Sequence, residues 1–203
     1  MRHRNDEARK ATHDLALQVA EELVKEYGLR GLSLRKVALA LGYSVGSLYL
    51  IFENLDDLML QVNASTLDDL YTILADIALK TKQPEARLYA LSHAYLQFTN
   101  EQLHRWRMVS EHSLPVGVQP PNWYQEKFLR LISLMEKALQ ESIPKLEPSV
   151  SAQAARALWL GMHDICFFSL TEKLDVVGID AAENLINEFI KTYLIGLKTQ
   201  YPN

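Results

Sequence analysis

The sequence of residues 33–49 is SLRKVALALGYSVGSLY, and this stretch decides the fold. Apolar residues recur at helical spacing from Leu34 to Leu41, directly after Ser33, a residue type that commonly caps helix N-termini. Gly42 follows at the point where a tight turn needs a residue that tolerates positive φ. The stretch therefore predicts a short helix, a turn and the start of a second helix.

The second helix has the features that a DNA recognition helix needs. Ser44 can cap its N-terminus, and Leu48 can serve as the apolar anchor that faces the preceding helix. Ala38 is small enough to let the two backbones approach where the helices meet. In a helix-turn-helix, the N-terminal end of this second helix enters the major groove. The pattern thus favours a helix-turn-helix near the N-terminus.

Helical periodicity continues on both sides of this stretch, and no convincing strand alternation occurs. We expect an all-α fold of about nine helices, with a three-helix DNA-binding head and a C-terminal helical domain. Gly28 is expected to end the first helix in a left-handed conformation. The other expected helices are a third through Leu48 to Phe52, a long fourth capped by Asn54 that ends near Lys80, and helices over 84–112, 122–143, 150–174 and from about 181.

Composition and charge are typical of a soluble globular protein whose head is more basic than its body. The 203 residues are 48% hydrophobic and 23% charged, with a net charge of −4. Residues 1–52 carry eight Lys and Arg against six Asp and Glu, a net +2, whereas residues 53–203 carry thirteen against nineteen, a net −6. This distribution is compatible with DNA binding by the head alone.

No apolar run approaches the roughly 18 residues of a membrane span, so we expect no membrane association and a cytoplasmic location. The single cysteine, Cys166, excludes an internal disulfide and is expected to be a buried core residue. The six histidines show no ligand spacing, so no metal and no cofactor are expected.

Residues 10–60 resemble the TetR family of transcriptional regulators. In that family a Thr/Ser-x-Arg-x-Val/Ile-Ala segment, a Gly-x-Ser turn and a Leu-Tyr-x-x-Phe segment recur near the N-terminus. The matching residues here are Ser33, Arg35, Val37, Ala38, Gly42, Ser44, Leu48, Tyr49 and Phe52, followed by Asp57 and Leu58.

The resemblance implies a DNA-binding transcriptional regulator, not an enzyme. Its expected partners are a palindromic double-stranded DNA operator, a small-molecule effector that releases a repressor from it, and a second copy of the chain bound through the last two helices. It implies a helix-turn-helix domain over 1–53 and an effector-binding and dimerisation domain over 54–203. Whether the chain represses or activates is left open.

The resemblance also implies which residues contact DNA. Two positions depart from the family, because Ile51 and Leu55 replace residues that commonly touch phosphates, and no residue over 44–52 is basic. Phosphate contacts must then come from Arg35, Lys36 and an N-terminal arm with Arg2, Arg4, Arg9 and Lys10. The expected DNA-binding residues are Ser33, Arg35, Lys36, Ser44, Val45, Gly46, Ser47, Tyr49 and Arg4.

Aromatic and sulfur-containing residues fall on helices that surround a small-molecule cavity in this family, and their apolar character indicates a hydrophobic effector. Trp159 and His163 also resemble the Trp-x-x-x-His segment of one C-terminal subgroup, although Asp164 stands where Gly is usual. Each such residue can equally be plain core. The expected ligand-binding residues are Tyr95, Phe98, Trp106, Met108, Trp123, Phe128, Trp159, His163 and Phe167.

Three other interpretations can be weighed. Residues 42–46 match the Gly-x-Ser-x-Gly pattern of hydrolases, but that pattern requires a strand-to-helix turn, and helical sequence precedes it here. A helical enzyme or carrier that binds a small molecule without any DNA role remains an alternative. So does a TetR-like scaffold that acts through protein partners.

Overall fold

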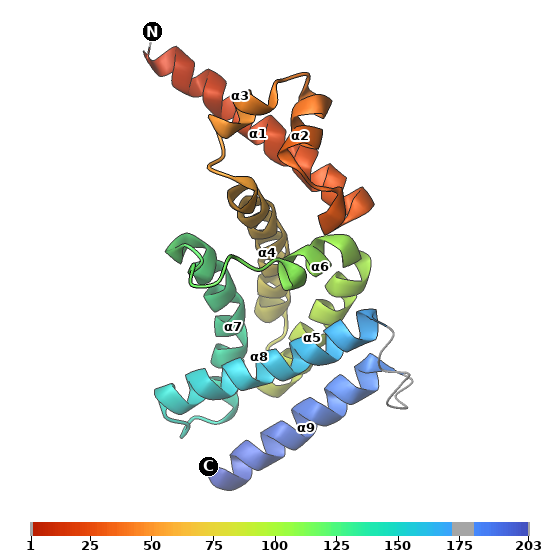
Figure 1. The fold of residues 1–203 in the computed structure, drawn as a ribbon. Helices are drawn as coiled ribbons and strands as arrows, with labels where there is room; N and C mark the ends of the chain where they lie inside the picture. The colour runs from red at the N-terminus through yellow and green to blue at the C-terminus, as the bar shows by residue number, and fades with distance from the viewer. Residues whose placement is uncertain (1, 172–180, 203) are drawn as a thin grey trace. The chain divides into compact units, whose positions relative to one another are not determined.

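All regular structure in the described part of the chain is helical, which confirms the all-α prediction (Figure 1). The computed structural model describes residues 2–171 and 181–202, with side chains from residue 6 onward. Nine α-helices and one 3-10 turn occur in these residues: α1 (Arg2–Tyr27), η1 (Leu29–Gly31), α2 (Leu34–Leu41), α3 (Val45–Tyr49), α4 (Leu55–Lys80), α5 (Pro84–Glu101), α6 (Leu103–Glu111), α7 (Asn122–Ser142), α8 (Pro148–Leu170) and α9 (Ala182–Gln200).

The helices form two compact units. The head unit comprises the residues up to Leu67 together with Gln102–Tyr124, and the body unit comprises Asp68–Glu101 together with the residues from Gln125 onward. Helix α4 contributes its first half to the head unit and its second half to the body unit. The domain boundary expected at residue 53 stays a prediction.

One buried cluster holds the head unit together. Apolar side chains of α1, α2 and α3 meet those of the first turns of α4, and α6 adds Met108. Burial of this kind contributes about 25 cal/mol for each Å² of apolar surface removed from water. The cluster consists of Ala16, Ala20, Val24, Leu32, Leu34, Val37, Ala38, Leu48, Phe52, Leu58, Met59, Val62 and Met108.

Helix α1 ends at a glycine, as expected, but its conformation differs from the prediction. Gly28 has φ 65° and ψ −164°, which is a positive φ without the ψ of a left-handed helical residue. This region of conformational space is almost exclusive to glycine. The reason is the next element: the Gly31 amide donates to the Gly28 carbonyl at 2.9 Å, so the chain continues directly into η1.

The helix expected over 84–112 is wrong as a single element, because it is two helices, α5 and α6. The break falls at Gln102, with φ −113° and ψ 39°, and no proline or glycine marks it. Its cause is tertiary packing. Helix α5 packs with α8 and α9 in the body unit, whereas α6 packs with α1 and η1 in the head unit.

In the body unit, α8 and α9 lie side by side (Figure 1). Their contact is close at Gly161, where an added Cβ would lie 2.4 Å from Cζ of Phe189. Helix α8 begins at Pro148, slightly earlier than expected, because proline is favoured in the first turn of a helix. Residues 172–174 of the expected helix lie outside the described residues. Cys166 is fully buried as predicted, and burial raises the pKa of its thiol to about 12.

Candidate nucleic-acid interface

The first helix of the predicted pair begins and ends as the sequence indicates. Ser33 Oγ accepts a hydrogen bond from the Lys36 amide at 3.2 Å, which caps the N-terminus of α2. At the other end, Gly42 adopts φ 71° and ψ 24°. The Tyr43 amide donates to the Ala38 carbonyl at 2.9 Å and the Gly42 amide to the Leu39 carbonyl at 3.2 Å. This pair of bonds is a Schellman motif, and it sets the direction of the turn.

Gly42→Val should lower the free energy of unfolding by at least about 1–2 kcal/mol, because a left-handed conformation crowds any β-carbon. No other atom would lie within 4 Å of that carbon, so the cost is backbone strain alone. Gly42→Asn is the control, since Asn tolerates this conformation and should cost less than Val. Urea unfolding of both variants is the measurement, and equal stability would contradict a left-handed turn.

The second helix, α3, is capped by serine as predicted, but it ends at Tyr49 and not at Phe52. Ser44 Oγ accepts from the Ser47 amide at 3.2 Å and also lies 2.9 Å from Ser47 Oγ. Both hydroxyls therefore serve the N-terminus of the helix itself. The side chain of Leu48 is fully buried beneath it, as the anchor interpretation requires.

The residues expected to contact DNA lie mostly at the surface of the head unit. Arg35, Lys36, Ser44, Gly46 and Tyr49 are exposed. Three further candidates are half-buried, namely Ser33, Val45 and Ser47. The structure thus brings the α2 cations and the exposed face of α3 onto one small two-helix element. That these residues contact DNA stays a prediction.

Ile51 and Leu55 have a structural role that the sequence pattern did not suggest. Both are partly buried and pack against the buried cluster of the head unit. Apolar residues at these two positions therefore add to the core of the head, and the polar contacts that the family often makes there are not available from them.

The N-terminal arm is helical, because α1 begins at Arg2. The side chains of Arg2 and Arg4 lie outside the described residues, so the expected contact by Arg4 stays a prediction. Lys10 is exposed. Arg9 donates from Nη2 to the carbonyl of Leu50 at 2.7 Å, a bond across 41 residues that sequence inspection missed.

Residues 16–62 match the sequence model described as "Bacterial regulatory proteins, tetR family". This segment is therefore similar in sequence to the helix-turn-helix region of the tetR family. The matched segment begins within α1, includes α2 and α3, and ends within α4. No curated protein matches the chain significantly.

Solved structures share the fold of this chain along almost its whole length. A protein of unknown function from a Rhodococcus species is 20% identical, with a TM-score of 0.73, over 91% of this chain and 94% of its own. The TetR family transcriptional regulator PfmR from Thermus thermophilus is 19% identical, with a TM-score of 0.59, over 90% and 98%. The fatty acid degradation regulator FadR from Bacillus halodurans is 16% identical, with a TM-score of 0.63, over 89% and 97%. At these identities the likeness establishes the fold.

The nine residues expected to bind a ligand do not form one group. Trp106, Met108 and Trp123 belong to the head unit. Met108 is part of the buried head cluster and Trp106 is almost fully buried, whereas Trp123 is exposed and contacts Tyr124 edge to face at 5.7 Å. Ligand contact by these three residues stays a prediction.

The other six candidates belong to the body unit, and four of them meet. Tyr95 is fully buried; its hydroxyl lies 2.6 Å from His163 Nδ1, and its ring meets Trp159 edge to face at 5.1 Å. His163 in turn stacks with Phe167 at 6.3 Å. Burial lowers the pKa of the His163 imidazole, and the neighbouring Asp164 carboxylate opposes that shift. Phe98 is buried and Phe128 half-buried, and the likeness of Trp159 and His163 to the Trp-x-x-x-His subgroup stays a prediction.

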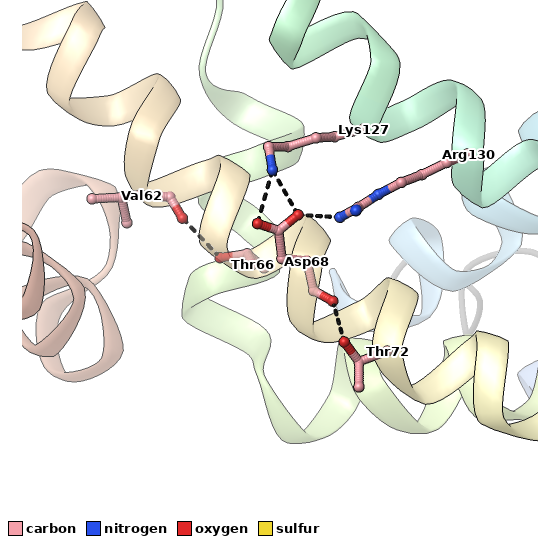
Figure 2. Close-up of polar contacts among 6 residues, drawn as sticks. All are labelled: Val62, Thr66, Asp68, Thr72, Lys127 and Arg130. Atoms are coloured by element: carbon pink, nitrogen blue, oxygen red, sulfur yellow. Dashed lines mark hydrogen bonds and ion pairs between the residues drawn. The ribbon is translucent and has the colours of Figure 1, made fainter.

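A second polar cluster joins α4 to α7 within the body unit (Figure 2). Asp68 on α4 accepts from Lys127 Nζ at 2.7 and 2.8 Å, and Arg130 binds the same carboxylate. The Arg130 guanidinium also lies over the Tyr71 ring, 4.4 Å from its centroid. One carboxylate thus holds two cations of α7 on the second half of α4.

The head unit contains a cavity of about 230 Å³ beside the first turn of α4. One wall carries the carboxylates of Glu53, Asp56 and Asp57, and residues of the loop before α7, including Leu114 and Val118, form another. Negative charge of this kind repels phosphate, so the cavity is not a surface for the DNA backbone.

The hydrolase interpretation fails on its structural context, because α2 precedes Gly42 and no strand occurs in the described ranges 2–171 and 181–202. Within the same ranges, no three His, Cys, Asp or Glu side chains lie close enough to share a metal ion. None of the helices described is both long and apolar enough to span a membrane.

Proposed function

We propose that the protein is a DNA-binding transcriptional regulator of the TetR kind, and that it is a homodimeric repressor released from a palindromic operator by a small-molecule effector. It would act in the cytoplasm, where a bacterial chromosome lies. The observation that carries the proposal is the tetR-family helix-turn-helix with the outer face of α3 exposed and its inner face fixed by Leu48.

Dimerisation through α8 and α9 is supported by apolar side chains that their own protomer leaves uncovered. Leu160 and Phe168 are exposed on α8, and Ile195 is exposed on α9. Exposed apolar side chains gathered on two adjacent helices commonly mark an interface. A two-fold axis through this pair would present two recognition helices to successive major grooves, about one helical turn of DNA apart.

The effector is proposed to bind in the body unit, around Tyr95, Trp159, His163 and Phe167. These residues combine large apolar surfaces with a buried hydroxyl–imidazole pair, the composition that ligand sites usually have. An effector can change DNA affinity only by binding one conformation better than the other. Helix α4, which contributes residues to both units, is proposed to transmit the change caused by the effector to the DNA-binding head. The Asp68 cluster fixes the second half of α4 to α7.

The test is selection of bound fragments from a random duplex library by the purified protein, at moderate and at raised salt. Enrichment of a short palindrome whose binding weakens with salt is the expected result, because phosphate contacts release counterions. Folded, dimeric protein that enriches no sequence would overturn the proposal. It would favour the alternative of a helical small-molecule-binding protein without a DNA role.

Tyr49→Ala should weaken binding to the selected duplex by roughly 5- to 100-fold, the range that one direct contact contributes. Tyr27→Ala is a matched control, because both side chains are 57% exposed and Tyr27 lies at the far end of α1. The control should leave DNA affinity unchanged. Fluorescence anisotropy with labelled duplex gives both values, and an equal effect of the two substitutions would exclude a contact by Tyr49.

A further inference from the structure

We propose that Arg9 and His13 of α1 form a bracket that fixes the C-terminal end of the recognition helix. In this proposal Arg9 is a positioning residue for DNA recognition and not a phosphate contact. The inference rests on the proposed DNA-binding function for its consequence, but the bracket itself is a property of the free protein.

Helix α3 needs such support because it has only five residues, Val45–Tyr49. A helix of this length is unstable by itself, so its position depends on its attachments. The Ser44 cap holds its first turn, and the buried side chain of Leu48 holds its fourth residue. Both attachments lie before Leu50, the residue that follows α3.

Arg9 supplies the attachment at that end. Its Nη2 donates to the Leu50 carbonyl at 2.7 Å, and Leu50 is the residue that directly follows α3. The last carbonyls of a helix lack partners within the helix and carry partial negative charge, which a guanidinium complements. The charge that sequence inspection assigned to DNA phosphate therefore has a partner inside the protein.

His13 lies one helical turn after Arg9 and holds the next residues of the same segment. Its ring stacks on Phe52, with centroids 5.3 Å apart and planes at 28°. Its Nε2 lies 2.7 Å from Gln61 Oε1, and Gln61 Nε2 donates to Asp57 Oδ1 at 2.9 Å. Asp57 also accepts from the Glu53 amide at 3.0 Å, so the chain from Leu50 to Asp57 is tied to both α1 and α4.

The position of α3 matters because base contacts require side chains held to within about 0.5 Å of the productive geometry. A residue that fixes the helix should affect the discrimination between DNA sequences. A residue that contacts phosphate should instead affect all sequences alike and contribute to the salt dependence of binding. These two roles give different results in one experiment.

The experiment compares Arg9→Ala with Lys10→Ala, which removes the same charge from the same turn of α1. Each variant is measured against the duplex enriched by selection and against a random duplex of equal length, over a range of salt. We expect Arg9→Ala to weaken binding of the selected duplex roughly 10-fold, with the random duplex and the salt slope unchanged. Lys10→Ala should not lower the discrimination between the two duplexes.

Two results would overturn the proposal. One is a salt slope for Arg9→Ala that falls by about 0.9, with both duplexes weakened alike, as loss of a phosphate contact requires. The other is an effect of Arg9→Ala no different from that of Lys10→Ala.

Amide hydrogen exchange in the absence of DNA separates the bracket from the proposed function. Arg9→Ala should speed exchange at residues 49–52 and leave α2 unchanged, which also shows that the head remains folded. Unchanged exchange at residues 49–52 would refute the bracket even if the protein binds DNA. Wild-type protein that binds no duplex would refute the proposed function, while the exchange data would still decide the bracket.

Discussion

Leu48→Ala should lower the free energy of unfolding by about 2–5 kcal/mol, because truncating a fully buried leucine leaves a cavity. Leu48 is 0% exposed, and its side chain is the main apolar attachment of α3 to the head. Urea unfolding followed by circular dichroism measures the loss of stability. Binding of the selected duplex should fall with it, because α3 then loses its fixed position.

Leu39→Ala is the control for this substitution. The same atoms are removed from the same two-helix element, but Leu39 is 80% exposed, so its stability should change by no more than about 0.5 kcal/mol. A Leu48→Ala variant as stable as Leu39→Ala would mean that α3 does not depend on this anchor.

Leu160→Asp should raise the dissociation constant of the dimer at least about 100-fold, since burying an unpaired charge costs roughly 3–5 kcal/mol. Leu160 is 60% exposed in the protomer, so the substitution is tolerated by the fold of the body unit. A two-fold interface would contain this residue twice, which places two carboxylates in it. Light scattering over a dilution series measures the dissociation.

Leu79→Asp controls for the added charge, because Leu79 is 75% exposed near the end of α4 and does not belong to α8 or α9. This variant should remain dimeric. If Leu160→Asp dissociates no more readily than Leu79→Asp, the exposed face of α8 is not the interface. If it dissociates as expected, its DNA affinity should also fall, because each head then binds one half-site alone.

The cluster around Asp68 supports the proposed role of α4 in transmitting the effect of the effector. Lys127 and Arg130 of α7 bind the Asp68 carboxylate (Figure 2). The Arg130 guanidinium also lies over the Tyr71 ring. Asp68 is about half exposed, so the contribution of this cluster to stability is modest. Its proposed role is to hold the part of α4 that belongs to the body unit in place against α7.

Local signals in the sequence were sufficient for the helix-turn-helix. Ser33 and Ser44 cap their helices, Gly42 takes a positive φ, and Leu48 is buried, all as expected. The two caps and the turn depend on residues within five positions of one another, and the apolar spacing marked Leu48 for burial. The ends of helices were harder to place, since α3 ends at Tyr49 and not at Phe52 as the pattern indicated.

The sequence by itself determined the helical class and the position of the helix-turn-helix, because capping, turn and periodicity act between near neighbours. Only the tertiary structure decided where the stretch 84–112 breaks, since its two halves pack into different units. It also decided that Ile51 supports the core and that Arg9 holds Leu50. These assignments depend on contacts between residues far apart in the chain. A periodic pattern does not indicate which distant residue a side chain contacts.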